Sequence, residues 1–268
     1  MRSMELAPIT PHCGAEVVGI DLSVAQEDET IATIDRALET HGVLVFRDQH
    51  VDVAAQRAFA ARFGELHQTQ YAGAVDGFPE VTVISERIKG ATSSWHADST
   101  FEPTPPRGSL LRFVEGPAVG GDTLWASTHA AFASLSSAMQ RLVDGLTAQH
   151  DSHHVAAQRQ KQQRGGEPFT LSTSEHPVVL GGNSPGRRSL FVNSTFTARI
   201  TELSETESNR VLSILFETIR SPDLQVRVRW EPGTLAFWSN YATQHYAVPD
   251  YDGTRTMHRC TLVGGPPR

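Results

Sequence analysis

Apolar residues recur every three or four positions in four stretches of the chain, which is the spacing of one face of an α-helix. In the first stretch Ile31, Ile34 and Leu38 share a face, and Gly42 follows the last turn, where glycine commonly ends a helix. The predicted helices are residues 27–41, 52–63, 129–146 and a fourth that Ser204 and Glu207 open as a capping box and Pro222 ends.

Shorter runs of apolar or alternating residues lie between these helices and predict β-strands. The predicted strands are residues 16–22, 43–46, 81–84, 109–114, 122–126, 191–193, 224–230, 234–240 and 254–263. Many short strands with a few helices indicate a mostly β fold with flanking helices. We predict a double-stranded β-helix, the cupin-like jelly roll, whose mouth has room for a metal ion and a substrate.

The chain contains no internal repeat and no low-complexity linker, so we predict a single domain over residues 1–268. Two stretches, near residues 68–94 and 150–188, include long polar and irregular runs. Long loops of this kind are often functional, so we interpret both stretches as lid-like segments.

The charge balance limits the partners of the protein. Thirty acidic residues against 23 basic residues give a formal net charge of −7, which argues against nucleic acid as a partner. No stretch approaches the ~20 apolar residues of a membrane-spanning helix, so we expect no membrane association. Cys13 and Cys260 are too few for a disulfide framework and fit the reducing cytoplasm. We also expect the protein to form a homo-oligomer, either a dimer or a tetramer.

His96, Asp98 and the distant His245 carry the strongest chemical signal in the sequence. Residues i and i+2 of an extended strand point to the same face, so His96 and Asp98 can offer an imidazole and a carboxylate to one metal ion. With His245 they would form the two-histidine, one-carboxylate set that leaves open positions on a non-haem Fe(II) ion. The residues alone leave two alternatives, a strand histidine bonded to a neighbour and a zinc hydrolase.

A second group of polar residues lies at 255–259, where Arg255 and Arg259 share a strand face and start about 13 Å apart. One guanidinium could clamp a carboxylate with two hydrogen bonds, and the other could reach a second anionic group. Thr123 follows the tight turn at 120–121 and could donate a hydrogen bond to an acid. Taken alone, these residues also fit two surface arginines on an edge strand and an ordinary hairpin turn.

Several motifs occur in a fixed order along the chain. They are GAEVVGIDL at 14–22, FGELH at 63–67, WHAD at 95–98, GGDTLWAS at 120–127, FVN at 191–193, TQHYA at 243–247 and RTMHR at 255–259. Together they resemble the taurine dioxygenase (TauD/TfdA) family of Fe(II)/2-oxoglutarate-dependent dioxygenases. The resemblance covers nearly the whole chain and implies an oxidoreductase that uses Fe(II), 2-oxoglutarate and O₂.

The resemblance implies roles for the candidate residues. His96, Asp98 and His245 would bind the iron, and Arg255, assisted by Thr123, would hold the distal carboxylate of 2-oxoglutarate.

Four further residues are implied or suggested as substrate contacts. Arg259 would lie near the iron and engage an anionic group of the substrate or the chelating end of the keto acid. Phe196 stands where family members pack an aromatic ring against the substrate. Tyr71 and Ser152 are additional substrate-pocket candidates.

The pattern of taurine-specific members is not evident in this chain. Where they present a histidine and an asparagine, it has QTQY at 68–71 and ATSS at 91–94, which puts taurine itself in doubt. We therefore expect hydroxylation of a small anionic organic substrate, a sulfonate or an alkyl sulfate, coupled to decarboxylation of 2-oxoglutarate to succinate and CO₂. Alternatives in the family are a biosynthetic hydroxylase or desaturase and an aryloxyalkanoate-cleaving enzyme. More distant ones are a zinc hydrolase and a non-catalytic anion-binding jelly roll.

Overall fold

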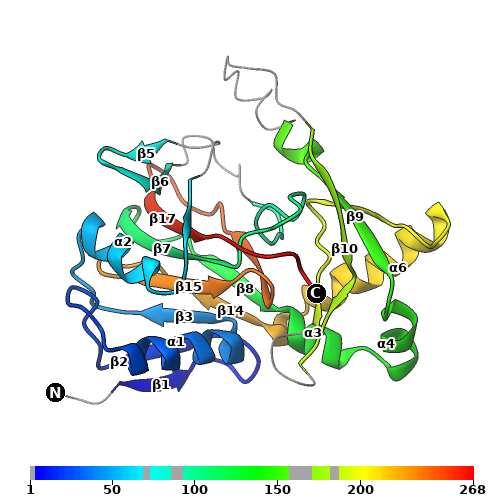
Figure 1. Cartoon of the computed structure of the whole chain (residues 1–268), viewed down its shortest axis with the longest axis horizontal. Helices are drawn as coiled ribbons and strands as arrows, with labels where there is room; N and C mark the ends of the chain where they lie inside the picture. Colours follow the sequence, from blue (N-terminus) through cyan, green and yellow to red (C-terminus); the bar gives the residue numbers. More distant parts are fainter. Residues whose placement is uncertain (1–3, 69–72, 86–92, 157–170, 182–186) are drawn as a thin grey trace.

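The computed structural model describes residues 4–68, 73–85, 93–156, 171–181 and 187–268. Within these ranges the largest sheet has nine strands in the order β1-β2-β3-β15-β7-β17-β6-β5, with β4 paired to β17 (Figure 1). Their bounds are β1 Glu5–Pro8, β2 Ala15–Val18, β3 Val43–Phe46, β4 Leu66–His67, β5 Ala74–Val75, β6 Phe78–Ser85, β7 Gly108–Glu115, β15 Leu235–Ser239 and β17 Thr256–Leu262.

A smaller sheet packs against one face of the large sheet. Its order is β14-β8-β16, with bounds Gln225–Val228, Thr123–Ser127 and Thr243–Ala247, and all its pairs are antiparallel. Buried side chains of both sheets form one apolar cluster, to which Trp125 and Val226 come from the small sheet and Val45, Phe113 and Trp238 from the large one. Two sheets that enclose a common core are the jelly roll predicted from the strand pattern.

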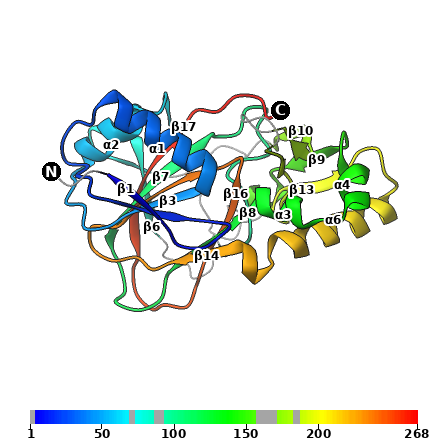
Figure 2. The ribbon, with the colours of Figure 1, turned by 90° about the horizontal axis from the view of Figure 1, so that it is seen from below.

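Two helices cover the opposite face of the large sheet. They are α1 (Asp28–His41) and α2 (Val53–Ala61), and Figure 2 shows both on the same side of the strands. Ile34 and Leu38 of α1 pack with Phe59 of α2 against Leu44 and Phe237 of the sheet. The alternation of the strands therefore supplies apolar side chains to both faces, and the predicted helices 27–41 and 52–63 are confirmed to within two residues at each end.

The remaining elements gather beside the two sheets (Figures 1 and 2). They are a sheet of β10 (Thr173–Pro177), β9 (Thr147–Asp151) and β13 (Thr197–Ile200), a pair of β11 (Val179–Leu180) and β12 (Ser189–Leu190), helices α3 (Thr128–Ser134), α4 (Ser137–Val143) and α6 (Glu205–Ile219), and a 3₁₀ turn at Pro222–Leu224. The capping box of α6 is formed as predicted, with Ser204 and Glu207 each bonded to the other's backbone. Leu215 and Ile219 of α6 lie in the core of this part.

The single helix predicted over 129–146 is wrong, because the structure divides it into α3 and α4. Leu135 is extended (φ −65°, ψ 146°), and the Ser136 hydroxyl accepts a hydrogen bond from the Met139 N–H at 3.2 Å. Ser136 therefore caps a new helix. The apolar spacing continues through the break, so periodicity alone does not reveal it.

Further differences concern the strands, because the apolar pattern does not predict β1, β4, β5, β9 or β13. The strand predicted at 191–193 lies two residues earlier, in β12, and the apolar pattern does not predict β16. The described parts of 150–188 contain β10 and β11 and are more regular than predicted. Residues 69–72, 86–92, 157–170 and 182–186 of the two lid-like segments lie outside the described residues, so the role of these segments as lids stays a prediction.

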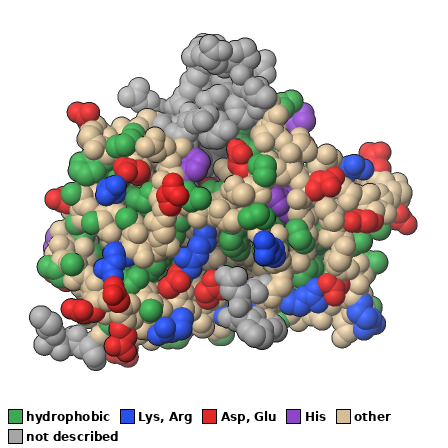
Figure 3. Space-filling model, viewed as in Figure 1, with side chains coloured by type: hydrophobic (Ala, Val, Ile, Leu, Met, Phe, Trp, Pro, Cys, Tyr) green, Lys and Arg blue, Asp and Glu red, His purple; other side chains and the backbone are tan. Residues whose placement is uncertain are grey.

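The surface agrees with the modest charge of the chain. On the face drawn in Figure 3, the coloured acidic and basic side chains are interspersed and form no large patch of one sign. Among the described residues, no helix has the length and apolar character needed to cross a membrane.

Candidate metal centre

Two distant stretches of chain meet at the edge of the small sheet. His245 lies in β16, which pairs with β8, and His96 lies beside it in an isolated antiparallel bridge. The His96 N–H donates to the His245 carbonyl at 3.2 Å, and the His245 N–H donates to the His96 carbonyl at 2.8 Å. The bridge holds the two imidazoles side by side, with ring centroids 4.2 Å apart.

The Nε2 atoms of both histidines face the carboxylate of Asp98. His96 Nε2 is 3.8 Å and His245 Nε2 is 3.9 Å from Asp98 Oδ1, and the three potential ligand atoms lie within 4.8 Å of one another. Bonds of ~2.1 Å to a metal ion would put neighbouring octahedral ligands about 3 Å apart. Small side-chain movements therefore bring all three atoms to one ion. The side chains of His96, Asp98 and His245 expose only 14%, 12% and 12% of their surface.

Hydrogen bonds outside the triad orient its members. His96 Nδ1 donates to the Ser94 carbonyl at 2.7 Å, which leaves the Nε2 lone pair free for a metal ion. Asn240 holds the Asp98 backbone at two points, because its Oδ1 accepts from the Asp98 N–H at 2.6 Å and its Nδ2 donates to the Asp98 carbonyl at 2.9 Å. His245 Nδ1 is buried and has no hydrogen-bond partner in the described part of the chain.

The surroundings favour the metal-binding protonation states. Burial, followed by the neighbouring His96, lowers the pKa of His245 to about 3. Burial would raise the pKa of Asp98, but the positive charge of Arg259 and the proximity of His245 and His96 outweigh burial and hold this pKa below its usual value. A neutral imidazole and an ionised carboxylate are the forms that bind a metal ion, so the donor set fits Fe(II).

Arg255 and Thr123 form a second polar group, buried beside the triad's sheet. An Nη atom of Arg255 donates to Thr123 Oγ1 at 3.2 Å, and the Trp230 indole N–H donates to the same oxygen at 3.0 Å. Arg255 is 4% exposed, its Nε has no hydrogen-bond partner, and no described carboxylate forms an ion pair with it. A buried guanidinium without an anion is costly, so this group fits a carboxylate ligand.

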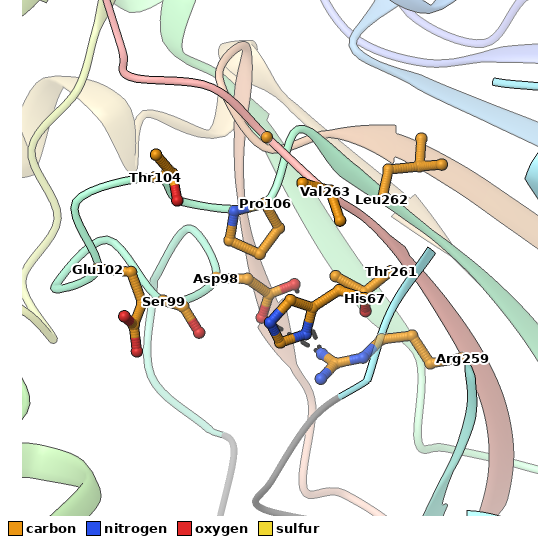
Figure 4. A pocket seen from close by; sticks show the side chains of 11 residues that line it. His67, Asp98, Ser99, Glu102, Thr104, Pro106, Arg259, Thr261, Leu262 and Val263 are labelled. Atoms are coloured by element: carbon orange, nitrogen blue, oxygen red, sulfur yellow. Dashed lines mark hydrogen bonds and ion pairs between the residues drawn. The ribbon is translucent and has the colours of Figure 1, made fainter. Parts of the chain in front are cut away.

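Arg259 lies at the wall of a cavity of about 320 Å³ beside Asp98 (Figure 4). Its Nη1 is 3.4 and 3.5 Å from the two Asp98 carboxylate oxygens, and its Nε has no hydrogen-bond partner among the residues described. His67, Ser99 and Glu102 also line the cavity with polar groups. A cation at the wall of such a cavity can bind the anionic group of a small molecule.

The structure treats the other three candidates differently. The Phe196 ring is buried and meets the His96 ring edge-on, with centroids 6.0 Å apart. Ser152 is fully buried, and its hydroxyl accepts a hydrogen bond from the Ser172 N–H at 2.8 Å. The described contacts thus bring Phe196 to the triad and link Ser152 to a neighbouring backbone. Tyr71 lies outside the described residues.

Asn240 is the residue of this centre to which sequence reasoning assigns no role. It directly follows the fully buried strand β15 and is itself 1% exposed. A buried amide at the end of an apolar strand must find hydrogen-bond partners, which is the signal that points to a role. The sequence does not reveal that those partners belong to the backbone of Asp98, far away along the chain.

Comparisons with known proteins agree with this geometry. The model of the family described as "Taurine catabolism dioxygenase TauD, TfdA family" matches residues 5–261. The alpha-ketoglutarate-dependent sulfate ester dioxygenase of Pseudomonas putida is 36% identical over 275 residues, which cover 98% of this chain and 91% of that protein. An alkylsulfatase of Acinetobacter baylyi is 33% identical over 98% of this chain and 86% of that protein.

Solved structures give the same result for the fold. A structure from Burkholderia xenovorans described as a "Putative Alpha-ketoglutarate-dependent Taurine Dioxygenase" superimposes with a TM-score of 0.87 at 36% identity and covers 99% of this chain and 94% of that chain. A second structure from the same organism, described as a taurine dioxygenase, superimposes with a TM-score of 0.86 at 35% identity and covers 99% of this chain and 93% of that chain. The jelly roll and its His-Asp-His triad, which could hold a metal ion, therefore agree with a known group of enzymes. The chain belongs to the TauD/TfdA family and is a dioxygenase that uses Fe(II), 2-oxoglutarate and O₂.

Proposed function

We propose that His96, Asp98 and His245 hold the iron, and that Arg255 and Thr123 bind the distal carboxylate of 2-oxoglutarate. One observation carries this proposal. Two imidazole nitrogens and one carboxylate oxygen converge within 4.8 Å in a largely buried place, where three protein ligands leave coordination positions open. The buried Arg255, for which the described chain supplies no anion, supports the co-substrate part.

Held by these residues, iron and the keto acid would supply the activation of O₂ and the oxidation of a substrate C–H bond, with conversion of the keto acid to succinate and CO₂. The chain positions the reactants. Arg255 and Thr123 fix one end of the keto acid, and Arg259 faces the cavity beside Asp98. Phe196 and Trp238, whose rings lie 6.0 Å from His96 and 5.1 Å from His245, limit the access of water.

We infer that the substrate is a small organic sulfate ester or sulfonate. The names of two relatives, a sulfate ester dioxygenase and an alkylsulfatase, support this class, as does the guanidinium of Arg259 at the cavity wall. The carbon next to the sulfur-containing group would be hydroxylated. Its C–O or C–S bond would then break, the new hydroxyl would become a carbonyl, and sulfate or sulfite would leave.

Anaerobic addition of Fe(II) and 2-oxoglutarate to the protein tests the metal centre. A visible charge-transfer band is expected with the wild type and is expected to be absent in His96→Ala. A wild type without this band would contradict the proposed centre. A zinc hydrolase, by contrast, would cleave its substrate without O₂ and without keto acid.

The product released beside succinate tests the substrate class. Alkyl sulfates, alkanesulfonates and aryloxy acids would each be incubated with the complete reaction mixture, and sulfate, sulfite, phenol and succinate would be measured. We expect sulfate or sulfite to form in step with succinate. Release of a phenol would favour the aryloxyalkanoate-cleaving alternative, and hydroxylation or desaturation without release would favour a biosynthetic enzyme.

We further propose that the enzyme acts in the cytoplasm as a homo-oligomer, a dimer or a tetramer. The two cysteines, Cys13 and Cys260, are buried and unpaired, as in many proteins of reducing compartments. Light scattering of the purified protein measures the oligomeric state directly, and a monomer at working concentration would contradict this part of the proposal.

A further inference from the structure

An ion network lies next to the Arg255–Thr123 group. Arg227, in β14, donates from Nε to Asp122 Oδ2 at 2.6 Å and from an Nη atom to Asp250 Oδ2 at 3.0 Å. The Arg227 side chain is 51% exposed, whereas the Asp122 side chain is only 12% exposed. One arginine on the surface thus joins two carboxylates from stretches of chain that are far apart in sequence.

Both carboxylates belong to the stretches that carry the two co-substrate candidates. Asp122 directly precedes Thr123, and Asp250 lies shortly before Arg255 in a connection, residues 248–255, without helix or strand. Further bonds join the same stretches, because the Gly121 N–H donates to Asp250 Oδ1 at 2.8 Å and the Val248 N–H donates to the Asp122 carbonyl at 2.9 Å.

The turn before Thr123 packs directly on this connection. A Cβ atom at Gly120, whose φ is +84°, would lie 2.5 Å from the Asp250 carbonyl oxygen, so only glycine permits the approach. Arg255 itself has no ion-pair partner among the described carboxylates to fix its guanidinium. Its position therefore depends on how firmly the connection 248–255 is held against the turn.

We propose that Arg227 is a positioning residue for 2-oxoglutarate. It acts through Asp122 and Asp250 to keep the Arg255 guanidinium and the Thr123 hydroxyl at the spacing that one carboxylate requires. This inference rests on the proposed co-substrate role of Arg255 and Thr123. The Arg227–Asp250 pair is half-exposed at both ends, and such pairs contribute little to folding, so its loss is expected to weaken keto-acid binding while the fold survives.

The test is an anaerobic titration of the Fe(II)-loaded protein with 2-oxoglutarate, followed by the visible band. Arg227→Gln is expected to raise the dissociation constant about tenfold, less than the roughly hundredfold that a displacement of ~1 Å at a reacting group can cost. Arg227→Lys should restore part of the affinity. Steady-state kinetics should show a raised KM for 2-oxoglutarate with kcat nearly unchanged, a split that a merely structural role would not give.

A second variant removes the same contact from its other end. Asp250→Asn keeps an acceptor for the Gly121 N–H but loses the charge that pairs with Arg227. Its effect should have the same direction as that of Arg227→Gln and be no larger, because Arg227→Gln also loses the ion pair with Asp122. The double variant should be no worse than Arg227→Gln alone, because both changes remove the same Arg227–Asp250 pair. Arg57→Gln breaks an ion pair of similar exposure with Glu80, remote from the turn, and serves as the matched control with unchanged affinity.

Arg255→Gln separates this inference from the proposed function. If Arg255→Gln binds 2-oxoglutarate as tightly as the wild type, the assigned co-substrate site is wrong. If Arg255→Gln binds weakly while Arg227→Gln and Asp250→Asn titrate like the wild type and like Arg57→Gln, the site stands and the positioning role of Arg227 is overturned.

Discussion

Two pairs of buried histidines occupy different parts of this molecule. His96 and His245 have ring centroids 4.2 Å apart, and His150 and His176 have centroids 5.3 Å apart. Both pairs are largely inaccessible, yet among the residues that the structure describes only the first converges on a carboxylate, that of Asp98. Burial and proximity of imidazoles are therefore not sufficient to indicate a metal centre.

The second pair bonds to uncharged groups instead. His150 Nδ1 lies 2.9 Å from the Thr100 hydroxyl, and His176 Nε2 donates to the carbonyl oxygens of Thr100 and Glu102 at 2.9 and 3.0 Å. These bonds fix the chain that follows Asp98. In the first pair, His96 Nδ1 donates to the Ser94 carbonyl, and His96 Nε2, which faces Asp98, is left free. The direction of the free lone pairs is what distinguishes a ligand from a structural histidine.

The largest expected effect comes from replacing one member of each pair. His245→Ala should lower Fe(II) affinity by more than ~100-fold while the fold remains. The loss of a residue that only hydrogen-bonds to a metal ligand already costs about 10–100-fold in affinity, and the loss of the ligand itself should cost more. His176→Ala should retain Fe(II) binding but lower the free energy of unfolding by about 1–3 kcal/mol, since it removes buried hydrogen bonds. Metal titration and urea unfolding measure the two effects. Equal loss of metal binding in both variants would contradict the distinction.

Two buried asparagines allow the same comparison at residues that are not themselves candidate ligands: Asn240 beside Asp98, and Asn193 beside Thr100. Asn240→Ala should lower Fe(II) affinity about 10–100-fold, because the amide holds the Asp98 backbone at two points. Asn193→Ala is the control, since that amide donates to the Thr100 hydroxyl in the structural network. Calorimetric titration with Fe(II) under argon measures both. An unchanged affinity in Asn240→Ala would show that Asp98 needs no such support.

The smallest expected effect is a change in pH dependence. Burial, followed by His176, lowers the pKa of His150 to about 3, whereas an unfolded histidine titrates near 6.5. Between these values the unfolded state binds a proton that the native state does not, so stability is lost as the pH falls through this window. Each pH unit well inside the window costs up to ~1.4 kcal/mol for one histidine.

His150→Gln tests this contribution. The metal-free variant should lose about 1–2 kcal/mol less stability than the wild type between pH 6.5 and pH 5, measured by urea unfolding at each pH. An identical pH dependence in the two proteins would show that His150 is not the group that titrates.

The sequence predicts those parts of the molecule that depend on local patterns. The capping box of Ser204 and the apolar run at 43–46 give α6 and β3 with nearly correct bounds. The break at Ser136 escapes prediction because a serine inside an apolar period looks like an exposed helical position. The jelly roll as a whole follows from the number of short strands, but their order in the sheets does not.

In the metal centre too, local motifs are predictable from the sequence and contacts between distant residues are not. The triad and the Arg255–Thr123 pair follow from motifs whose resemblance to a family is specific. Asn240 and Arg227 escape because their importance lies in contacts with residues distant in sequence. The structure gives the hydroxyl of Ser152 a backbone donor, Ser172 N–H, and its role as a substrate contact stays a prediction. Tyr71 stays a prediction.

The bridge between His96 and His245 closes more than half of the chain into a loop, and its two backbone hydrogen bonds are joined there by the bonds of Asn240 to Asp98 and of Ser93 to Ala247. One ferrous ion on both side chains would act as a cross-link across it and would favour the native state by mass action. Iron supply would then affect the stability of the protein as well as its turnover, and a chelated sample would be cleaved by proteases more readily than the iron-loaded one.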